Sequence, residues 1–240
     1  MKRSLWIGCG AAFLILCLVM SSPAWLVSDL VVKQLPELKL GTVSGRAWRG
    51  QVDYLQYQDI KLRQLQWHFS PTGLFRGVPL AISFTNPAKV TALVGVAAEN
   101  TLRLRDVEAE GNIAELMGIA QLPSMGFDGV VELGLVAADV SPAGCVSIAG
   151  GVTLASLLGD IDGIGDIAPV SAELSCTNGQ LTVVIDENNP SRVRGQVILR
   201  NNGRPSGNIM LSPEKGSALF KSLGLFLGAP RNNTDFVMRF

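Results

Sequence analysis

Apolar and polar side chains alternate with a period of two in many short stretches of the chain. This alternation is typical of strands that bury one face and leave the other face in water. It recurs in residues 65–69, 78–84, 101–105, 131–136, 181–185 and 193–200. We therefore expect a mainly β domain, in which antiparallel strands form a curved sheet or a sandwich.

Turn residues support antiparallel neighbours in the last third of the chain. Asn178 and Gly179 stand between two apolar stretches, and Asn202 and Gly203 follow residues 193–200. An Asn-Gly pair supplies two residues with positive φ, which a two-residue hairpin turn requires. The spacing predicts a meander of about four strands in this region.

Helical patterns are few and short. Residues 31–35 are expected to continue the apolar N-terminal helix until Pro36 stops it, and residues 113–119 predict one or two helical turns. The longest pattern covers residues 212–228, where Ser212 is expected as the N-cap and Pro213 as the first helical residue. We expect the apolar stripe of this helix to pack on the sheet rather than on a membrane. The stripe consists of Leu219, Phe220, Leu223, Phe226 and Leu227.

The start of the chain is a long apolar segment. Residues 5–27 carry no charge and are long enough to cross roughly 30 Å of hydrocarbon as a helix. Lys2 and Arg3 precede the segment, and basic flanks stay on the cytoplasmic side. We expect a single transmembrane helix that anchors the chain. The alternative is a signal peptide with a cleavage site at residues 22–24.

This interpretation divides the chain into three parts. Residues 1–4 form a cytoplasmic tip, residues 5–27 form the anchor, and residues 28–240 form an exported, β-rich periplasmic domain. The exported part is long enough for one large core, and a division into two sub-halves near residues 28–125 and 126–240 is also possible.

Two of the four cysteines lie in the exported part, at Cys145 and Cys176. An oxidising compartment makes a disulfide between them the first expectation, and two unpaired buried thiols are the alternative. Cys9 and Cys17 lie inside the apolar segment. A metal site is not expected, because the exported part has no second cysteine pair and no histidine near these two.

Charge and motif content disfavour several classes of function. The chain has 20 acidic and 20 basic residues, and it has no basic run, so no nucleic-acid partner is expected. His68, the single histidine, lies on the polar side of a predicted strand and is interpreted as a surface residue. Residues 160–166 match a calcium loop poorly, because the glycine falls at the fourth position and no closing glutamate follows. No catalytic motif stands in a supporting context, so we expect no enzyme, no cofactor and no small-molecule substrate.

Three short motifs after the apolar segment carry a family resemblance. They are a Gly-x-x-Trp-x-Gly turn, a Leu-x-Trp strand that ends in proline, and a Leu-x-x-Gly step. Their key residues are Gly45, Trp48, Gly50, Trp67, Pro71, Leu74 and Gly77. With the later cysteine pair and a Ser-Pro before an apolar helix, the chain resembles the family of type II secretion system protein N (general secretion pathway protein N).

The resemblance implies a non-catalytic accessory component of the type II secretion machinery in the inner membrane of a Gram-negative bacterium. Its implied partners are other secretion-system components, in the inner-membrane platform or in the periplasmic channel, while membrane lipid surrounds the anchor. Physical reasoning assigns structural roles to the motif residues. Gly45 and Gly50 suit a bend or bulge, and Trp48 and Trp67 are expected to bury large areas on one sheet face.

The same strands also suit a second function, which is the binding or handling of lipid in the periplasm. Membrane-anchored sheets with one apolar concave face carry acyl chains in proteins that resemble the AsmA class. Alternating strands serve such a groove as well as they serve a closed core. An open apolar trough in the structure would distinguish the groove from the closed core.

The anchor leads to a prediction about topology. A fusion of alkaline phosphatase to the C-terminus should be active, because this enzyme folds only after export and the positive flank holds the N-terminus in the cytoplasm. Activity of the fusion in intact cells and the mature N-terminal sequence are the measurements. An inactive fusion, or a mature chain that starts near Trp25, would contradict an uncleaved anchor.

Overall fold

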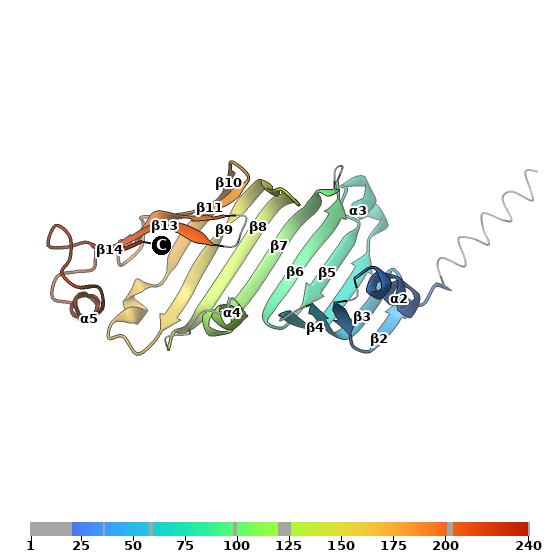
Figure 1. Ribbon diagram of the computed structural model, residues 1–240, viewed down its shortest axis with the longest axis horizontal. Helices are drawn as coiled ribbons and strands as arrows, with labels where there is room; N and C mark the ends of the chain where they lie inside the picture. The colour runs from blue at the N-terminus through green and yellow to red at the C-terminus, as the bar shows by residue number, and fades with distance from the viewer. Residues whose placement is uncertain are drawn as a thin grey trace, which may run out of the picture.

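The computed structural model describes residues 21–35, 37–57, 60–97, 100–119, 126–200 and 204–239. Its main feature is one 14-stranded antiparallel sheet, shown in Figure 1. From β3 onward, each strand pairs with the strand that follows it in the chain, while β1 and β2 both pair with β3. The prediction of a mainly β antiparallel fold is confirmed, and the sheet is open rather than a sandwich of two sheets.

The first half of the sheet carries the shorter strands. They are β1 (Leu38–Leu40), β2 (Val43–Arg46), β3 (Arg49–Tyr57), β4 (Ile60–Phe69), β5 (Leu80–Phe84), β6 (Ala88–Val96) and β7 (Leu102–Asn112). The second half begins with two long strands of 14 and 15 residues. Its strands are β8 (Asp128–Ser141), β9 (Gly144–Leu158), β10 (Val170–Thr177), β11 (Gln180–Ile185), β12 (Arg194–Leu199), β13 (Pro205–Leu211) and β14 (Phe236–Arg239).

Short helices lie at the margins of the sheet. They are α2 (Ala24–Gln34), α3 (Pro71–Phe75), α4 (Ile113–Ile119), the 3₁₀ turn η2 (Ile164–Ile167) and α5 (Ala218–Leu227). The prediction of a helix at residues 113–119 is confirmed by α4. Within the described residues, no helix has both the length and the apolarity needed to cross a membrane. The predicted anchor at residues 5–27 lies outside the described part of the chain, apart from its last seven residues.

The strand register separates polar from apolar positions from β5 to β14. One continuous row of cross-strand partners is apolar or glycine: Phe84, Val90, Ala109, Leu133, Val152, Ala172, Ile185, Gly195, Ile209 and Met238. The neighbouring row, one residue away on every strand, lies on the opposite face because successive side chains alternate. It is mostly polar: Ser83, Thr91, Glu108, Gly134, Gly151, Glu173, Val184, Gln196, Asn208 and Arg239.

The tight turn between β10 and β11 has the predicted chemistry. Asn178 and Gly179 have φ values of 52° and 75°, and Thr177 pairs directly with Gln180 across the turn. The second predicted Asn-Gly turn lies outside the described residues. The strands on either side of it, β12 and β13, pair as a hairpin.

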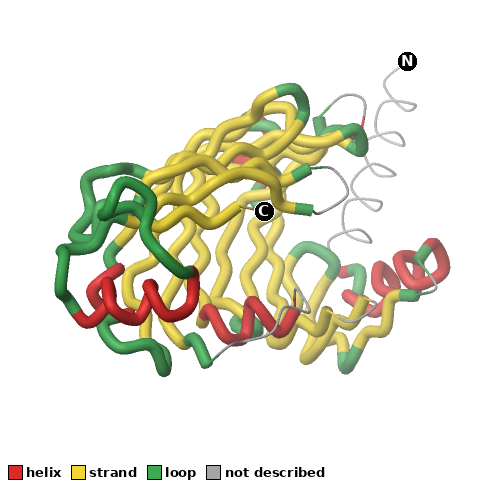
Figure 2. Tube along the Cα trace, turned by 60° about the vertical axis from the view of Figure 1, so that its left-hand side comes forward, coloured by secondary structure: helices red, strands yellow, loops and turns green. Residues whose placement is uncertain are grey.

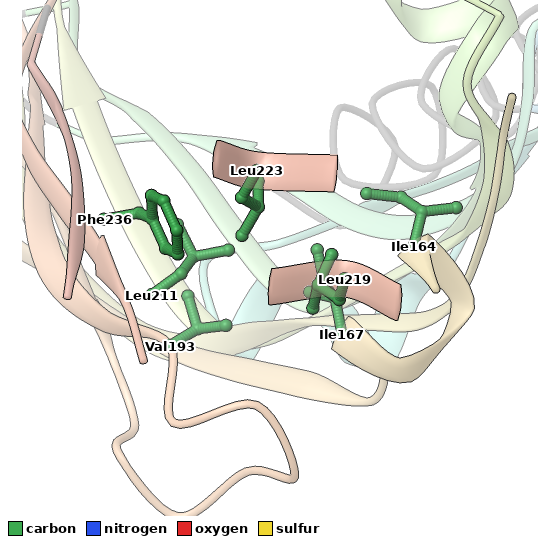
Figure 3. Close-up of a cluster of buried hydrophobic side chains, with 7 residues drawn as sticks. All are labelled: Ile164, Ile167, Val193, Leu211, Leu219, Leu223 and Phe236. Carbon is green, nitrogen blue, oxygen red and sulfur yellow. The ribbon is translucent and has the colours of Figure 1, made fainter. Parts of the chain in front are cut away.

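The apolar face has two buried clusters. One lies in the middle of the sheet and contains Ala92, Val107, Leu135, Ala138 and Leu174. The other lies at the C-terminal end, where α5 and η2 pack against the strands (Figure 3). It contains Ile164, Ile167, Val193, Leu211, Leu219, Leu223 and Phe236.

The predicted start of the last helix was wrong. The helix begins at Ala218, and its N-cap is Ser217, whose Oγ accepts a hydrogen bond from the backbone N–H of Phe220 at 3.1 Å. Gly216 has a φ of +82°, which a right-handed helix cannot contain. Ser212, the predicted cap, instead donates a hydrogen bond to Asp235 Oδ1 at 2.6 Å. The predicted end at Gly228 is confirmed.

The predicted apolar stripe packs on the sheet only in part. Leu219 and Leu223 are buried and Phe220 is half-buried, but Phe226 and Leu227 are 69% and 42% exposed. The last turn of α5 therefore presents apolar side chains to the outside.

Leu223→Asp should destabilise the domain by roughly 3 kcal/mol or more, because a carboxylate without a partner would replace a core side chain. Leu223 is only 6% exposed. Leu225→Asp is the matched control, because Leu225 lies in the same helix and is 87% exposed. Thermal and urea unfolding of both variants measure the difference. Equal stability of the two variants would show that α5 does not pack on the sheet.

Candidate functional site

An apolar cavity of about 630 Å³ opens on the apolar face at the C-terminal end of the sheet. Its lining runs from Val131 on β8 through Val152 on β9 and Ile185 on β11 to Met238 on β14. A single cavity can touch such distant strands only if the sheet curves around it. Figure 2 shows this curvature, with the last strands curling over the helices. The apolar face is therefore the concave face here.

Helices and loops close one side of the cavity. Leu223 of α5 and Ile164 and Ile167 of η2 belong both to the buried cluster and to the cavity lining. The turn η2 is held by Ser191, whose Oγ donates a hydrogen bond to the Asp166 carbonyl at 2.7 Å. These contacts give the wall a fixed shape, because they tie it to the sheet through packing and hydrogen bonds.

The loop between β11 and β12 is held by the side chain of Asn189. Its Nδ2 donates to the carbonyls of Asp186 and Val193 at 2.8 and 2.7 Å. Its Oδ1 accepts from the backbone N–H of Val193 at 2.8 Å. The side chain of Val193 is thereby positioned in the cavity lining.

The mouth of the cavity combines apolar side chains with one acid. Phe226 and Leu227 from the end of α5 line it and remain exposed. Asp160, in the loop after β9, is the one charged side chain among the described lining residues. The lining thus offers dispersion contacts and almost no hydrogen bonds, which suits an apolar ligand.

Asp160 is the one described lining residue whose side chain could act as an acid or a base. The other described lining residues include no histidine, cysteine, lysine, serine or tyrosine, which are common nucleophiles and bases. In the described part of the chain, no cluster of three or more His, Cys, Asp or Glu side chains could hold a metal ion. The chemistry of the described lining is therefore that of an apolar binding site.

A charged cluster on the polar face ties β7 to β8. Arg105 donates from Nη1 and Nη2 to the two carboxylate oxygens of Asp139 at 3.0 and 3.3 Å. Arg103 Nε lies 3.5 Å from Asp139 Oδ1, and Ser147 Oγ donates to Oδ2 at 3.3 Å. The hydrogen bond from Arg105 is the main reason that the pKa of Asp139 lies below its ordinary value.

A second network joins β12, β13 and β14 at the other end. Ser212 and Arg194 both contact Asp235, with Arg194 Nη2 at 3.3 Å from Oδ2. The hydrogen bond from Ser212 is the largest cause of the lowered pKa of Asp235. The last strand is therefore fixed by polar contacts on one face and by Phe236 in the core on the other.

The Cys145–Cys176 disulfide predicted from the sequence is confirmed. It joins the start of β9 to the end of β10, with 5.7 Å between the Cα atoms. The backbone pairing of these two strands ends at Gly150 and Leu174. The disulfide therefore fastens the strand ends beyond the last backbone pair.

The family-motif residues gather at the other end of the sheet. Gly45, with a φ of +94°, pairs with Gly50 across the β2–β3 hairpin. Gly50 also pairs with Trp67, whose ring covers the space that a side chain at position 50 would need. Trp67 Nε1 donates a hydrogen bond to the carbonyl of Ala47 at 2.9 Å, so this side chain stabilises the β2–β3 turn.

Two further motif residues, Trp48 and Pro71, lie at the ends of strands β3 and β4. Trp48 lies in the turn between β2 and β3, rather than within a strand, and its carbonyl accepts from the N–H of Phe69 at 2.6 Å. Pro71 is the first residue of α3, and Ser70 Oγ caps that helix by accepting from Gly73 at 3.3 Å.

None of the family-motif residues lines the apolar cavity. Several of them, with His68, border a wide hollow of about 1020 Å³ on the first half of the sheet. The sequence did not identify the cavity residues as a site, because they come from many strands and are mostly ordinary aliphatic side chains. In the sequence they are visible only as the apolar positions of alternating strands.

These features define a class of protein: an open β sheet with one apolar face and an apolar cavity on that face. The model for the family "Type II secretion system (T2SS), protein N" matches residues 36–239. The chain belongs to this family, and the resemblance seen in the sequence is confirmed. Comparison with curated proteins and with solved structures gave no match.

Asp139→Asn should lower stability at neutral pH by roughly 1 kcal/mol, the scale of a partly exposed ion pair. Asp139 has 21% of its side chain exposed. The pKa of Asp139 in the folded protein is below its ordinary value of 3.8. The ionised carboxylate therefore contributes its full stabilisation above pH 3.8, and this stabilisation is lost as the pH falls through the lowered pKa. Urea unfolding from pH 7 to pH 3 should show the two proteins converging in acid. A constant difference over this range would exclude a role for the ionised carboxylate.

Proposed function

We propose that this protein is a non-catalytic accessory component of the type II secretion machinery, held in the inner membrane and acting in the periplasm through protein contacts. The observation that carries the proposal is the family match, which spans every strand of the sheet. The cavity lining supports the non-catalytic part, because Asp160 is the one acid or base among its described residues and has no catalytic partner there.

An apolar edge of the sheet is the best surface for a protein partner. Val96, Leu102 and Val140 are cross-strand neighbours at the ends of β6, β7 and β8, and all three are exposed. Leu74 and Phe75 of α3 are exposed near the same edge. We call these five residues the α3 edge patch. Contiguous exposed apolar residues of this kind mark interaction surfaces.

The inner-membrane location rests on the apolar segment at residues 5–27 and its basic flank. The described helix α2 begins within this segment and exposes Trp25 and Leu26. These side chains suit the interface between lipid and water. The two sub-halves near residues 28–125 and 126–240 stay a prediction.

Lipid handling is the second candidate function, and the apolar cavity favours it. The cavity opens from the concave face and is lined by aliphatic and aromatic side chains. A trough of this kind is what a lipid-carrying sheet needs and what a closed core lacks.

Deletion of the gene should lower export of folded substrates across the outer membrane, while their delivery to the periplasm stays normal. The measurements are substrate activity in the medium and in the periplasm, with outer-membrane phospholipid content alongside. Normal secretion with altered lipid content would replace the first candidate function with the second.

Phe75→Asp with Val96→Asp should reproduce the secretion defect if the α3 edge patch binds a partner. The control is Val184→Asp, because Val184 is 45% exposed on the polar face of the sheet. All three proteins should accumulate to the same level. Full secretion with the double variant would show that partners bind elsewhere.

A further inference from the structure

We propose that the apolar cavity holds an acyl chain of a phospholipid, with an amine-bearing head group beside Asp160. This inference rests on the second candidate function and specifies its ligand and site. The cavity lies away from the three short motifs near the start of the sheet, since none of their residues lines it.

The size and chemistry of the cavity suit a hydrocarbon chain. Its volume of about 630 Å³ lies within the range of roughly 300–1,000 Å³ found for small-molecule sites. A water molecule in a cavity needs two to four polar partners, and this lining offers almost none. A hydrocarbon chain makes favourable dispersion contacts with such walls. Its transfer out of water adds the hydrophobic contribution to binding.

The cavity is bordered by strands that lie far apart in the sheet. Its lining includes Val131 on β8 and Met238 on β14, and five strands lie between these two in the sheet order. Because neighbouring strands are about 4.8 Å apart, these strands form a curved wall around the cavity. A flexible, unbranched chain can adapt its shape to such a wall.

The end of α5 forms an apolar entrance. Phe226 and Leu227 both line the cavity and face outward, and Leu225 beside them is the most exposed leucine of the helix. Exposed apolar side chains at a cavity mouth let a chain pass between lipid and protein without crossing polar groups.

Charge at the mouth selects the head group. Asp160 is the one charged lining residue among those described. The last turn of α5, which ends at Gly228, also borders the cavity, and its free carbonyls carry partial negative charge. A fatty-acid carboxylate or an anionic head group would be repelled beside Asp160. An ammonium group is attracted, and the phosphate of a zwitterionic phospholipid then lies farther out.

Photocrosslinking in living cells tests the proposal on the full, membrane-anchored chain. Phe226→p-benzoylphenylalanine places the probe at the mouth, and Phe75→p-benzoylphenylalanine is the matched control, since Phe75 is 93% exposed on α3. Cells are labelled with radioactive phosphate, irradiated, and the protein is isolated and analysed by mass spectrometry. We expect a phosphorus-labelled phospholipid adduct at position 226 and at least about tenfold less at position 75.

A cavity-filling variant shows whether the chain lies inside. Ala172 is a buried lining residue on β10, so Ala172→Phe should occupy the cavity and lower the adduct by about tenfold. The milder Ala172→Leu should lower it less, and formation of the Cys145–Cys176 disulfide reports that each variant is folded. Val184→Phe, on the opposite face, should leave the adduct unchanged.

The head-group assignment has its own test. Asp160→Lys should shift the adducts from amine-bearing to anionic phospholipids. An adduct without phosphorus would mean a free fatty acid and would overturn the head-group assignment. A phospholipid adduct that both Ala172 variants leave intact, or an adduct with protein alone, would overturn the site. These adducts therefore test the proposed site. The outer-membrane lipid content of the deletion strain tests the lipid-handling function separately.

Discussion

The fold depends on one constraint, which is that the strands from β5 to β14 keep one continuous row of apolar residues and glycine on the same face. Side chains alternate along a strand, so a slip of one residue between any two neighbours would carry the apolar set to the water-facing side. The row from Phe84 to Met238 shows that this does not happen anywhere along it. Register shifts do occur, between Thr91 and Leu93 and within the β8–β9 pair. They bend the sheet without exchanging its faces.

The apolar face of an open sheet must either be covered by other parts of the chain or remain free to bind another molecule. In the middle, Val107, Leu135 and Leu174 pack into one cluster and bury one another. At the C-terminal end, α5 with η2 covers part of the apolar face. The 3₁₀ turn and a ten-residue helix are too small to cover all of it. The cavity is the space that remains, and its apolar walls follow from the same alternation that builds the sheet.

Much of this could be predicted from the sequence, because strand alternation and Asn-Gly turns are local signals. The strands at residues 131–136 and 181–185, the turn at Asn178 and the disulfide were all foreseen. The long strands were foreseen only in part, because Gly150 and Gly151 inside β9 interrupt its apolar pattern. In the structure these glycines allow close backbone approach to β8 and β10. The cavity could not be foreseen, since its shape depends on the curvature of the sheet and on where α5 begins.

Because strands that follow one another in the chain also pair with one another, the sheet resembles a linear array of hairpins. In such an array each unit is stabilised mainly by its immediate neighbours, and contacts between distant parts of the chain are few. A chain that emerges from its N-terminus onward can therefore pair each new strand with the strand before it. Folding can then proceed in the order of the sequence, and the cavity, which needs β14 and α5, is completed last.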